Sequence, residues 1–152
     1  GGSIENRCRF ALEIATAVLA AVGPERLMIR ISPSRYMGDI YEWDEKDQML
    51  AFLIPALNEI GVRILDISCA NSNFFETAQP VIQVIRERCH WEHIIIGGAS
   101  LTSENAENEL CSGRLDLVTW GRAILANPDF VQRMETNTEL LEMTSEIRNK
   151  LF

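Results

Sequence analysis

The chain has 152 residues, about the length of one domain, and 47% of them are hydrophobic and 24% charged, which is enough apolar material for a core. Its 14 Lys and Arg against 22 Asp and Glu give a formal net charge of −8 without a basic stripe, which argues against a nucleic-acid or anionic-membrane partner. The longest apolar runs, such as 17–22, are too short to cross a bilayer, so we expect a cytoplasmic protein.

The first sixty residues alternate between helical and strand patterns. Apolar residues at helical spacing predict an amphipathic helix over 3–22. A short apolar run predicts a buried strand over 27–32, closed by Pro33. A helix is expected over 44–60, with a kink at Pro55 because proline cannot donate a backbone hydrogen bond.

The same alternation continues through the middle of the chain. Strands are expected over 62–68 and 93–98, with a helix over 80–89 between them. A helix capped by Thr102 or Ser103 then leads to a last strand over 115–120. Strands and helices thus form a βα repeat.

Helices are also expected after the last strand. Residues 123–125 could form a short helix, and Asn127-Pro128-Asp129 has the cap, first-turn proline and first-turn acid of another. The tail over 138–152 reads as a charged C-terminal helix.

The βα repeat predicts an α/β fold with a parallel sheet, in a single domain over 1–152. Parallel strands joined by right-handed crossover helices leave two candidate topologies, a doubly wound sheet and part of a (β/α)₈ barrel. A complete barrel needs eight units and about 250 residues, whereas this sequence contains four units.

Glycines and an arginine follow two of the strands, where parallel α/β folds bind ligands. Gly97-Gly98 ends one strand and Gly121-Arg122 ends the next. Glycines let the backbone approach an anion, and arginine offers a cationic fork suited to phosphate. The alternative is that the glycines make a tight turn and Arg122 lies on the surface.

Arg30 is a charged residue inside an apolar strand, which is costly without an acceptor. It either faces a ligand or pairs with Asp66, the only acid of the neighbouring strand. No G-x-S-x-G, Walker loop or G-x-G-x-x-G after a strand occurs, and the scattered cysteines and histidines show no metal-ligand spacing. We therefore expect no metal site and no triad-type hydrolase.

Three segments, in chain order, resemble the C-terminal half of old yellow enzymes, which are FMN-dependent ene-reductases built on a (β/α)₈ TIM barrel. They are Gly1-Gly2-Ser3-Ile4-Glu5-Asn6-Arg7 with Arg9-Phe10, Ile29-Arg30-Ile31-Ser32-Pro33, and Trp120-Gly121-Arg122 followed by Asn127-Pro128-Asp129. The resemblance implies that the four strands are the fifth to eighth of such a barrel, followed by a C-terminal helix.

The resemblance also assigns cofactor-binding residues. Arg30 matches the arginine at the pyrimidine edge of the flavin, and Gly98 and Ala99 match positions whose backbone reaches the flavin phosphate. Gly121 and Arg122 match the pair that completes the phosphate site. None of these residues is assigned a catalytic role.

The family's substrate-binding histidine pair, or His-Asn pair, and its proton-donating tyrosine precede the segment that this sequence resembles. We therefore expect the FMN-binding half of an oxidoreductase that, when complete, transfers hydride from NAD(P)H through FMN to activated alkenes. Whether this chain is itself an enzyme stays open.

The alternative function is that of a catalytically incomplete half-barrel that serves as a phosphate-binding, flavin-binding or assembly module. A doubly wound phosphate-binding protein is a third option. Because four strands leave two open edges, the expected partner is a second copy or an N-terminal half-barrel.

Overall fold

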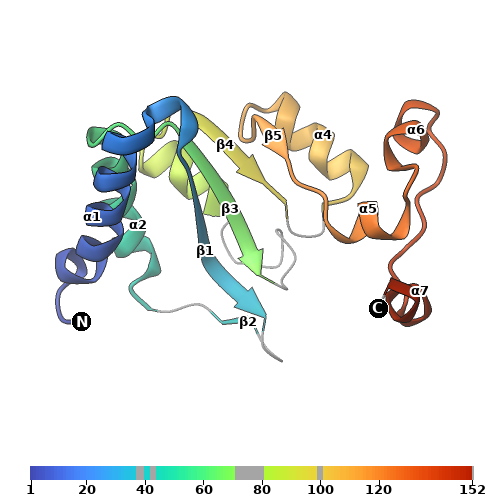
Figure 1. Ribbon diagram of the computed structural model, residues 1–152, viewed down its shortest axis with the longest axis horizontal. Helices are drawn as coiled ribbons and strands as arrows, with labels where there is room; N and C mark the ends of the chain where they lie inside the picture. Colours follow the sequence, from blue (N-terminus) through green and yellow to red (C-terminus); the bar gives the residue numbers. More distant parts are fainter. Residues whose placement is uncertain (37–39, 42–43, 71–80, 99–100, 152) are drawn as a thin grey trace. The chain divides into compact units, whose positions relative to one another are not determined.

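The computed structural model describes residues 1–36, 40–41, 44–70, 81–98 and 101–151 (Figure 1). The contacts within the chain fall into two compact units, Gly1–Val118 and Thr119–Phe152.

The first unit is built on a five-stranded sheet with the order β2-β1-β3-β4-β5. The strands are β1 (Met28–Tyr36), β2 (Ile40–Tyr41), β3 (Ile64–Ala70), β4 (Ile94–Gly97) and β5 (Leu117–Val118). β1, β3, β4 and β5 are parallel, and β2 pairs with the outer edge of β1 in the antiparallel direction. The parallel strands follow one another in the sheet as they do in the sequence. A doubly wound sheet would reverse this order at a switch point, so the topology is that of a (β/α)₈ barrel segment.

A helix connects each successive pair of parallel strands. The helices of the first unit are α1 (Ile4–Val22), the 3₁₀ turn η1 (Pro24–Arg26), α2 (Lys46–Glu59), α3 (Val81–Gln83), the π-helical turn η2 (Val84–Arg88) and α4 (Ser103–Cys111). Ser3 caps α1 by accepting a hydrogen bond from Asn6 N at 3.4 Å, and Thr102 caps α4 by accepting one from Asn105 N at 3.2 Å. Of the two caps expected for α4, Thr102 is the one used.

Pro33 does not end β1, as the sequence analysis expected, but lies within it. Ile31 pairs with Ile67, whereas Ser34 pairs with Cys69, so β1 contains one extra residue between these pairs. A bulge interrupts the hydrogen-bond ladder and accommodates a proline, which has no N–H to donate. The strand therefore continues for nine residues, while β5 has only two.

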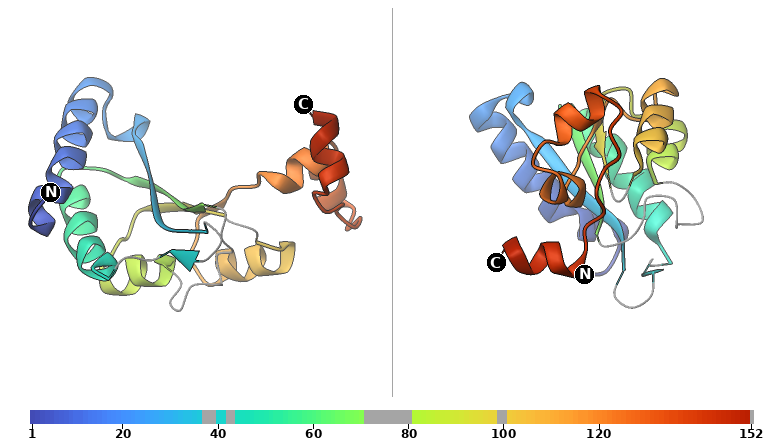
Figure 2. Two further views of the ribbon diagram at one scale, coloured as in Figure 1. Left: turned by 90° about the horizontal axis from the view of Figure 1, so that it is seen from below. Right: turned by 90° about the vertical axis from the view of Figure 1, so that its right-hand side faces the viewer.

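The two faces of the sheet have different surroundings. Figure 2 shows α1, α2, η2 and α4 around the outside of the curved sheet. On this covered face Leu65, Ile67 and Ile95 are at most 1% exposed and pack in the core. The opposite face carries no helix of the described part of Gly1–Val118, and we call it the open face.

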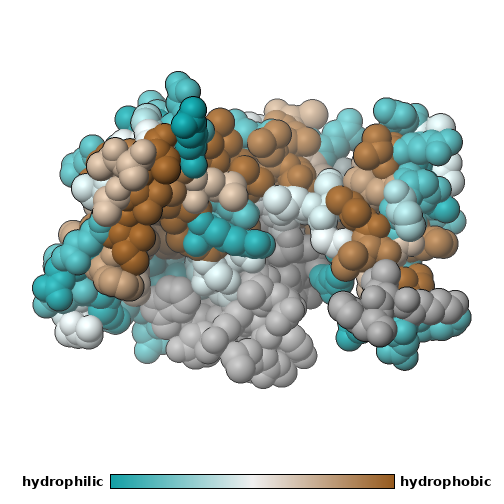
Figure 3. Space-filling view, viewed as in Figure 1, coloured by the Kyte–Doolittle hydropathy of each residue, from teal (hydrophilic) through white to brown (hydrophobic). Residues whose placement is uncertain are grey.

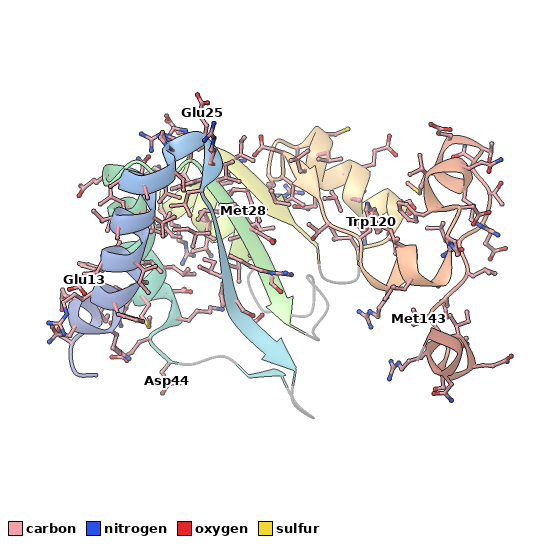
Figure 4. All side chains as sticks on the ribbon, in the orientation of Figure 1. Glu13, Glu25, Met28, Asp44, Trp120 and Met143 are labelled. Atoms are coloured by element: carbon pink, nitrogen blue, oxygen red, sulfur yellow. The ribbon has the colours of Figure 1, made fainter. Side chains whose placement is uncertain are left out.

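The open face is largely apolar. Met28, Ile94 and Leu117 lie on it and are 49%, 40% and 55% exposed. Figure 3 looks onto this face and shows hydrophobic residues over the strands, and Figure 4 labels Met28 at the start of β1. In a closed barrel the same face is the interior, filled by side chains from the other strands.

Arg86 joins the elements at the amino ends of β4 and β5. Its guanidinium donates to the backbone carbonyls of Trp91, His93 and Arg114 at 2.9, 2.7 and 3.2 Å and pairs with Asp116. The Asp116 carboxylate also accepts from Ile95 N at 2.7 Å. This Arg86 network holds η2 against the starts of two strands.

The second unit consists of three short helices, α5 (Arg122–Ala126), α6 (Phe130–Glu135) and α7 (Ser145–Leu151). The short helix expected over 123–125 is α5. The C-terminal helix is present, but it covers only the last part of the expected range 138–152. None of the helices in the described residues of the chain has the length and apolar character that a membrane span requires.

Asn127 has a different role from the expected helix cap. Its side chain is fully buried; Nδ2 donates to Ala123 O at 2.8 Å and to Leu141 O at 3.0 Å, and Oδ1 accepts from Leu141 N at 2.8 Å. Asp129 is the N-cap position of α6, without a side-chain cap bond. Asn127 therefore fixes the segment around Leu141 to α5, and this segment has no regular secondary structure.

Candidate functional site

Residues of the four parallel strands form two rows across the open face. The first row is apolar and contains Met28, Ile64 and Ile94, which are paired in register. The second row lies two residues closer to the carboxyl ends and contains Arg30, Asp66, Ile96 and Leu117. The second row therefore places two charged residues, Arg30 and Asp66, beside apolar ones. It lies toward the carboxyl ends of the strands, where parallel α/β folds bind ligands.

Arg30 and Asp66 form that ion pair across β1 and β3. Arg30 Nε lies 3.4 Å from Asp66 Oδ2, and the side chains are 63% and 7% exposed. The sequence left open whether Arg30 pairs with Asp66 or faces a ligand. The structure shows the ion pair, and it also leaves most of the Arg30 side chain exposed on the open face.

Asp66 keeps an unused acceptor. Its Oδ1 is buried and has no hydrogen-bond partner among the described residues. A buried polar atom without a partner costs about 1–3 kcal/mol, and such atoms are rare in folded proteins. From the sequence, Asp66 was interpreted either as the partner of Arg30 or as a residue that holds a loop by accepting backbone hydrogen bonds. Asp66 is a charged residue inside an apolar strand, as Arg30 is, and the same argument from the sequence could have identified it as a candidate site residue.

Gly97 is explained by packing. A Cβ added there would lie 2.7 Å from Leu115 Cδ2 and 2.9 Å from Ile82 Cδ1, and both of these side chains are buried. The missing side chain therefore lets two core residues approach β4 on the covered face. Gly98 is buried directly after β4, and Ala99 lies outside the described residues.

Gly121 and Arg122 open α5 in the second unit. Gly121 is the N-cap residue, and its carbonyl accepts from Leu125 N at 3.1 Å. A Cβ added at Gly121 would meet no heavy atom within 4 Å, so packing within the chain does not require a glycine there. Arg122 is exposed. Gly98 belongs to the first unit, whereas Gly121 and Arg122 belong to the second.

Trp120, directly before this pair, contacts an aromatic ring of its own unit. Its ring centroid lies 5.2 Å from that of Phe130, with the planes tilted by 47°. The contact links the segment before α5 to the first residue of α6. The sequence analysis used Trp120 only as part of a motif.

Comparison with known proteins identifies the family. The NADH:flavin oxidoreductase / NADH oxidase family matches residues 1–140. A probable flavin mononucleotide-dependent alkene reductase from Leishmania infantum is 39% identical over 134 residues, which is 88% of this chain and 35% of that protein.

Solved structures agree with the fold. Morphinone reductase in complex with tetrahydroNAD matches with a TM-score of 0.77 and 30% identity, over 97% of this chain and 39% of that one. The old yellow enzyme from Trypanosoma cruzi matches with a TM-score of 0.81 and 22% identity, over 96% of this chain and 38% of that one, and supports the fold alone. This chain spans little more than a third of these proteins, and it belongs to the NADH:flavin oxidoreductase / NADH oxidase family, as an old-yellow-enzyme-like α/β barrel segment.

Proposed function

We propose that this chain is the FMN-binding part of an old-yellow-enzyme-like oxidoreductase. The observation that carries the proposal is the exposed side chain of Arg30 on the open face of a chain that belongs to a flavin oxidoreductase family. A cation in this position suits the pyrimidine edge of a flavin, where negative charge develops on reduction. The unused acceptor on Asp66 and the free space around Gly121 are compatible with a bound ligand.

The same proposal assigns the phosphate of FMN to residues after β4 and β5. The family resemblance matches Gly98 and Ala99 to positions whose backbone reaches the phosphate in the family, and Gly121 and Arg122 to the pair that completes the family's phosphate site. Arginine binds phosphate by charge-assisted and often bidentate hydrogen bonds, which are stronger than neutral ones. This assignment rests on the family resemblance together with the exposed position of Arg122.

The complete reaction is assigned to this chain together with the rest of a barrel. When bound, FMN accepts hydride from NAD(P)H and passes it to an activated alkene. This chain's residues bind and orient the cofactor, whereas the substrate-binding histidine pair and the proton-donating tyrosine of the family lie outside the matched segment. We expect no alkene reduction by this chain alone.

The open face supports a second candidate function, that of an assembly module. Met28, Ile94 and Leu117 are large apolar residues at 40% exposure or more, and burying them against further strands removes apolar surface from water. The proposed partner is an N-terminal half-barrel or a second copy of this chain. Light scattering should give a mass above that of one 17.2 kDa chain, and a monomer that unfolds cooperatively contradicts this candidate.

An FMN titration tests the main proposal. The chain, in the assembly that it forms, should bind FMN and show flavin absorbance. Arg122→Ala should weaken binding about tenfold or more, because losing a hydrogen bond to a charged group costs about 1.5–3 kcal/mol. Arg148→Ala removes an exposed arginine of the same unit and serves as the matched control, with unchanged affinity expected. Equal affinities for all three proteins would remove Arg122 from the phosphate site.

A further inference from the structure

The contact between Asp66 and Arg30 involves only one polar atom of each side chain. The contact is made by Nε of Arg30 and Oδ2 of Asp66, at 3.4 Å. An arginine carries five N–H donors, and four of them belong to the two terminal nitrogens. In the part of the chain that the structure describes, no acceptor is recorded for these terminal nitrogens, and no donor reaches Asp66 Oδ1.

We propose that Asp66 is a positioning residue that holds the Arg30 guanidinium by Nε and moderates its charge toward the flavin. The inference deepens the proposed function and rests on it. It assigns a role to Asp66 in setting the reduction potential of the cofactor, in addition to the contact made by Arg30.

The positioning role follows from burial. Asp66 lies on β3, with Arg30 of β1 and Ile96 of β4 as its neighbours in register, and its side chain is 7% exposed. It is therefore a fixed anchor inside the sheet. Arg30 is 63% exposed, and a long exposed side chain has many accessible rotamers. Holding it by Nε restricts these rotamers and keeps the terminal nitrogens available to a ligand.

The charge role follows from the lack of other partners. No described donor neutralises the second oxygen of Asp66, so its negative charge acts mainly on Arg30 and on whatever binds beside it. This charge offsets part of the positive potential of the guanidinium. The flavin should therefore gain less stabilisation of its reduced, negatively charged ring than an unpaired arginine would give.

Two substitutions separate the two roles. Asp66→Asn keeps a side-chain oxygen beside Nε but removes the charge. The affinity ratio for reduced over oxidised FMN should rise about tenfold, which corresponds to a midpoint potential about 30 mV more positive for a two-electron couple. Asp66→Ala removes the acceptor as well, so FMN binding should weaken. Glu107→Gln, an exposed change of equal charge on α4, is the control and should leave the potential unchanged.

A measurement without the cofactor tests the tether independently. Motion of the Arg30 Nε–H, measured by NMR relaxation on the assembled chain, should be restricted in the wild type and in Asp66→Asn, and larger in Asp66→Ala. Equal motion in all three proteins would overturn the positioning role. A potential in Asp66→Asn equal to or below that of Glu107→Gln would overturn the charge role. If the wild-type assembly binds no FMN, the proposed function fails, while the relaxation measurement still tests the positioning role.

Discussion

Two of the arginine–aspartate pairs in the first unit, Arg86–Asp116 and Arg30–Asp66, differ in how many hydrogen bonds their side chains make. Arg86 and Asp116 lie at the amino ends of β4 and β5, where the arginine also binds three backbone carbonyls and the aspartate a backbone N–H. Arg30 and Asp66 lie on the open face and share one contact. Arg86 is 15% exposed, whereas Arg30 is 63% exposed.

The difference separates residues that hold the fold from residues that are available to a ligand. In barrels of this kind the amino ends of the strands contribute to stability, and the carboxyl ends carry the chemistry. A satisfied network such as that of Arg86 stabilises the folded state. A buried oxygen without a donor, as in Asp66, destabilises it and is expected at sites of function.

The largest effect is expected for Arg86→Met. The substitution removes the guanidinium that donates to the carbonyls of Trp91, His93 and Arg114 and pairs with Asp116, whose carboxylate keeps the hydrogen bond from Ile95 N. The free energy of unfolding, measured by urea denaturation, should fall by about 3 kcal/mol. Arg88→Met is the control, because the ion pair of Arg88 with Asp47 is about half exposed on both sides and should contribute less than about 1 kcal/mol. A similar decrease in the free energy of unfolding of the two variants would show that the Arg86 network contributes no more than an exposed ion pair.

A somewhat smaller effect is expected for Gly97→Ala. The added Cβ would press on Leu115 and Ile82, which are fixed in the core, and such overpacking costs about 1–3 kcal/mol. Gly121→Ala adds the same methyl group where no heavy atom lies within 4 Å, and its stability should change little. Comparing the two unfolding curves therefore tests whether the first glycine serves packing and the second does not. Equal stabilities would contradict the close contact at Gly97.

Local sequence patterns predicted most of the elements of this fold. The apolar spacing in α1, its Ser3 cap and the βα repeat are signals carried by neighbouring residues, and the structure contains all three. The continuation of β1 beyond Pro33 was missed, because the bulge that accommodates the proline depends on the register with β3. Asn127 was misread for a similar reason, since its partner Leu141 is 14 residues away.

The candidate site was predictable only in part. Arg30 was identified from its charge within an apolar strand, and its pairing with Asp66 was one of two interpretations that the sequence allowed. The unused oxygen of Asp66 and the packing role of Gly97 could not be predicted, because both depend on which atoms of other elements lie within a few ångströms.

Asp66→Asn should have a small effect on stability, in contrast to the change at Arg86. The substitution removes a buried charge whose second oxygen has no donor, and it keeps an acceptor for Arg30. Loss of the ion pair and removal of a buried charge oppose each other, so the free energy of unfolding should change by less than about 1 kcal/mol. Urea denaturation beside Arg86→Met measures this. A loss as large as that of Arg86→Met would make Asp66 a residue that holds the fold.

The smallest effect on stability is expected in the second unit, where Asp129 and Arg133 form another ion pair, one helical turn apart. Arg133 Nε donates to Asp129 Oδ1 at 2.8 Å, and this hydrogen bond is the main cause that lowers the pKa of Asp129 below its usual value. A carboxyl group with a lowered pKa in the folded state stabilises that state above its unfolded pKa, and the contribution disappears as the pH falls through the folded value. Asp129→Asn should therefore be slightly less stable than the wild type at neutral pH, and the difference should vanish in strong acid.

Glu142→Gln, which removes an exposed carboxylate of the same unit, provides the control for the loss of one negative charge. NMR titration of the Asp129 carboxyl measures the shift directly, and a pKa at or above the usual value would contradict the contact. Because the pair is exposed, its loss should leave the Arg86 network and the Arg30–Asp66 pair unaffected, so the contrast between those two pairs should persist in this variant.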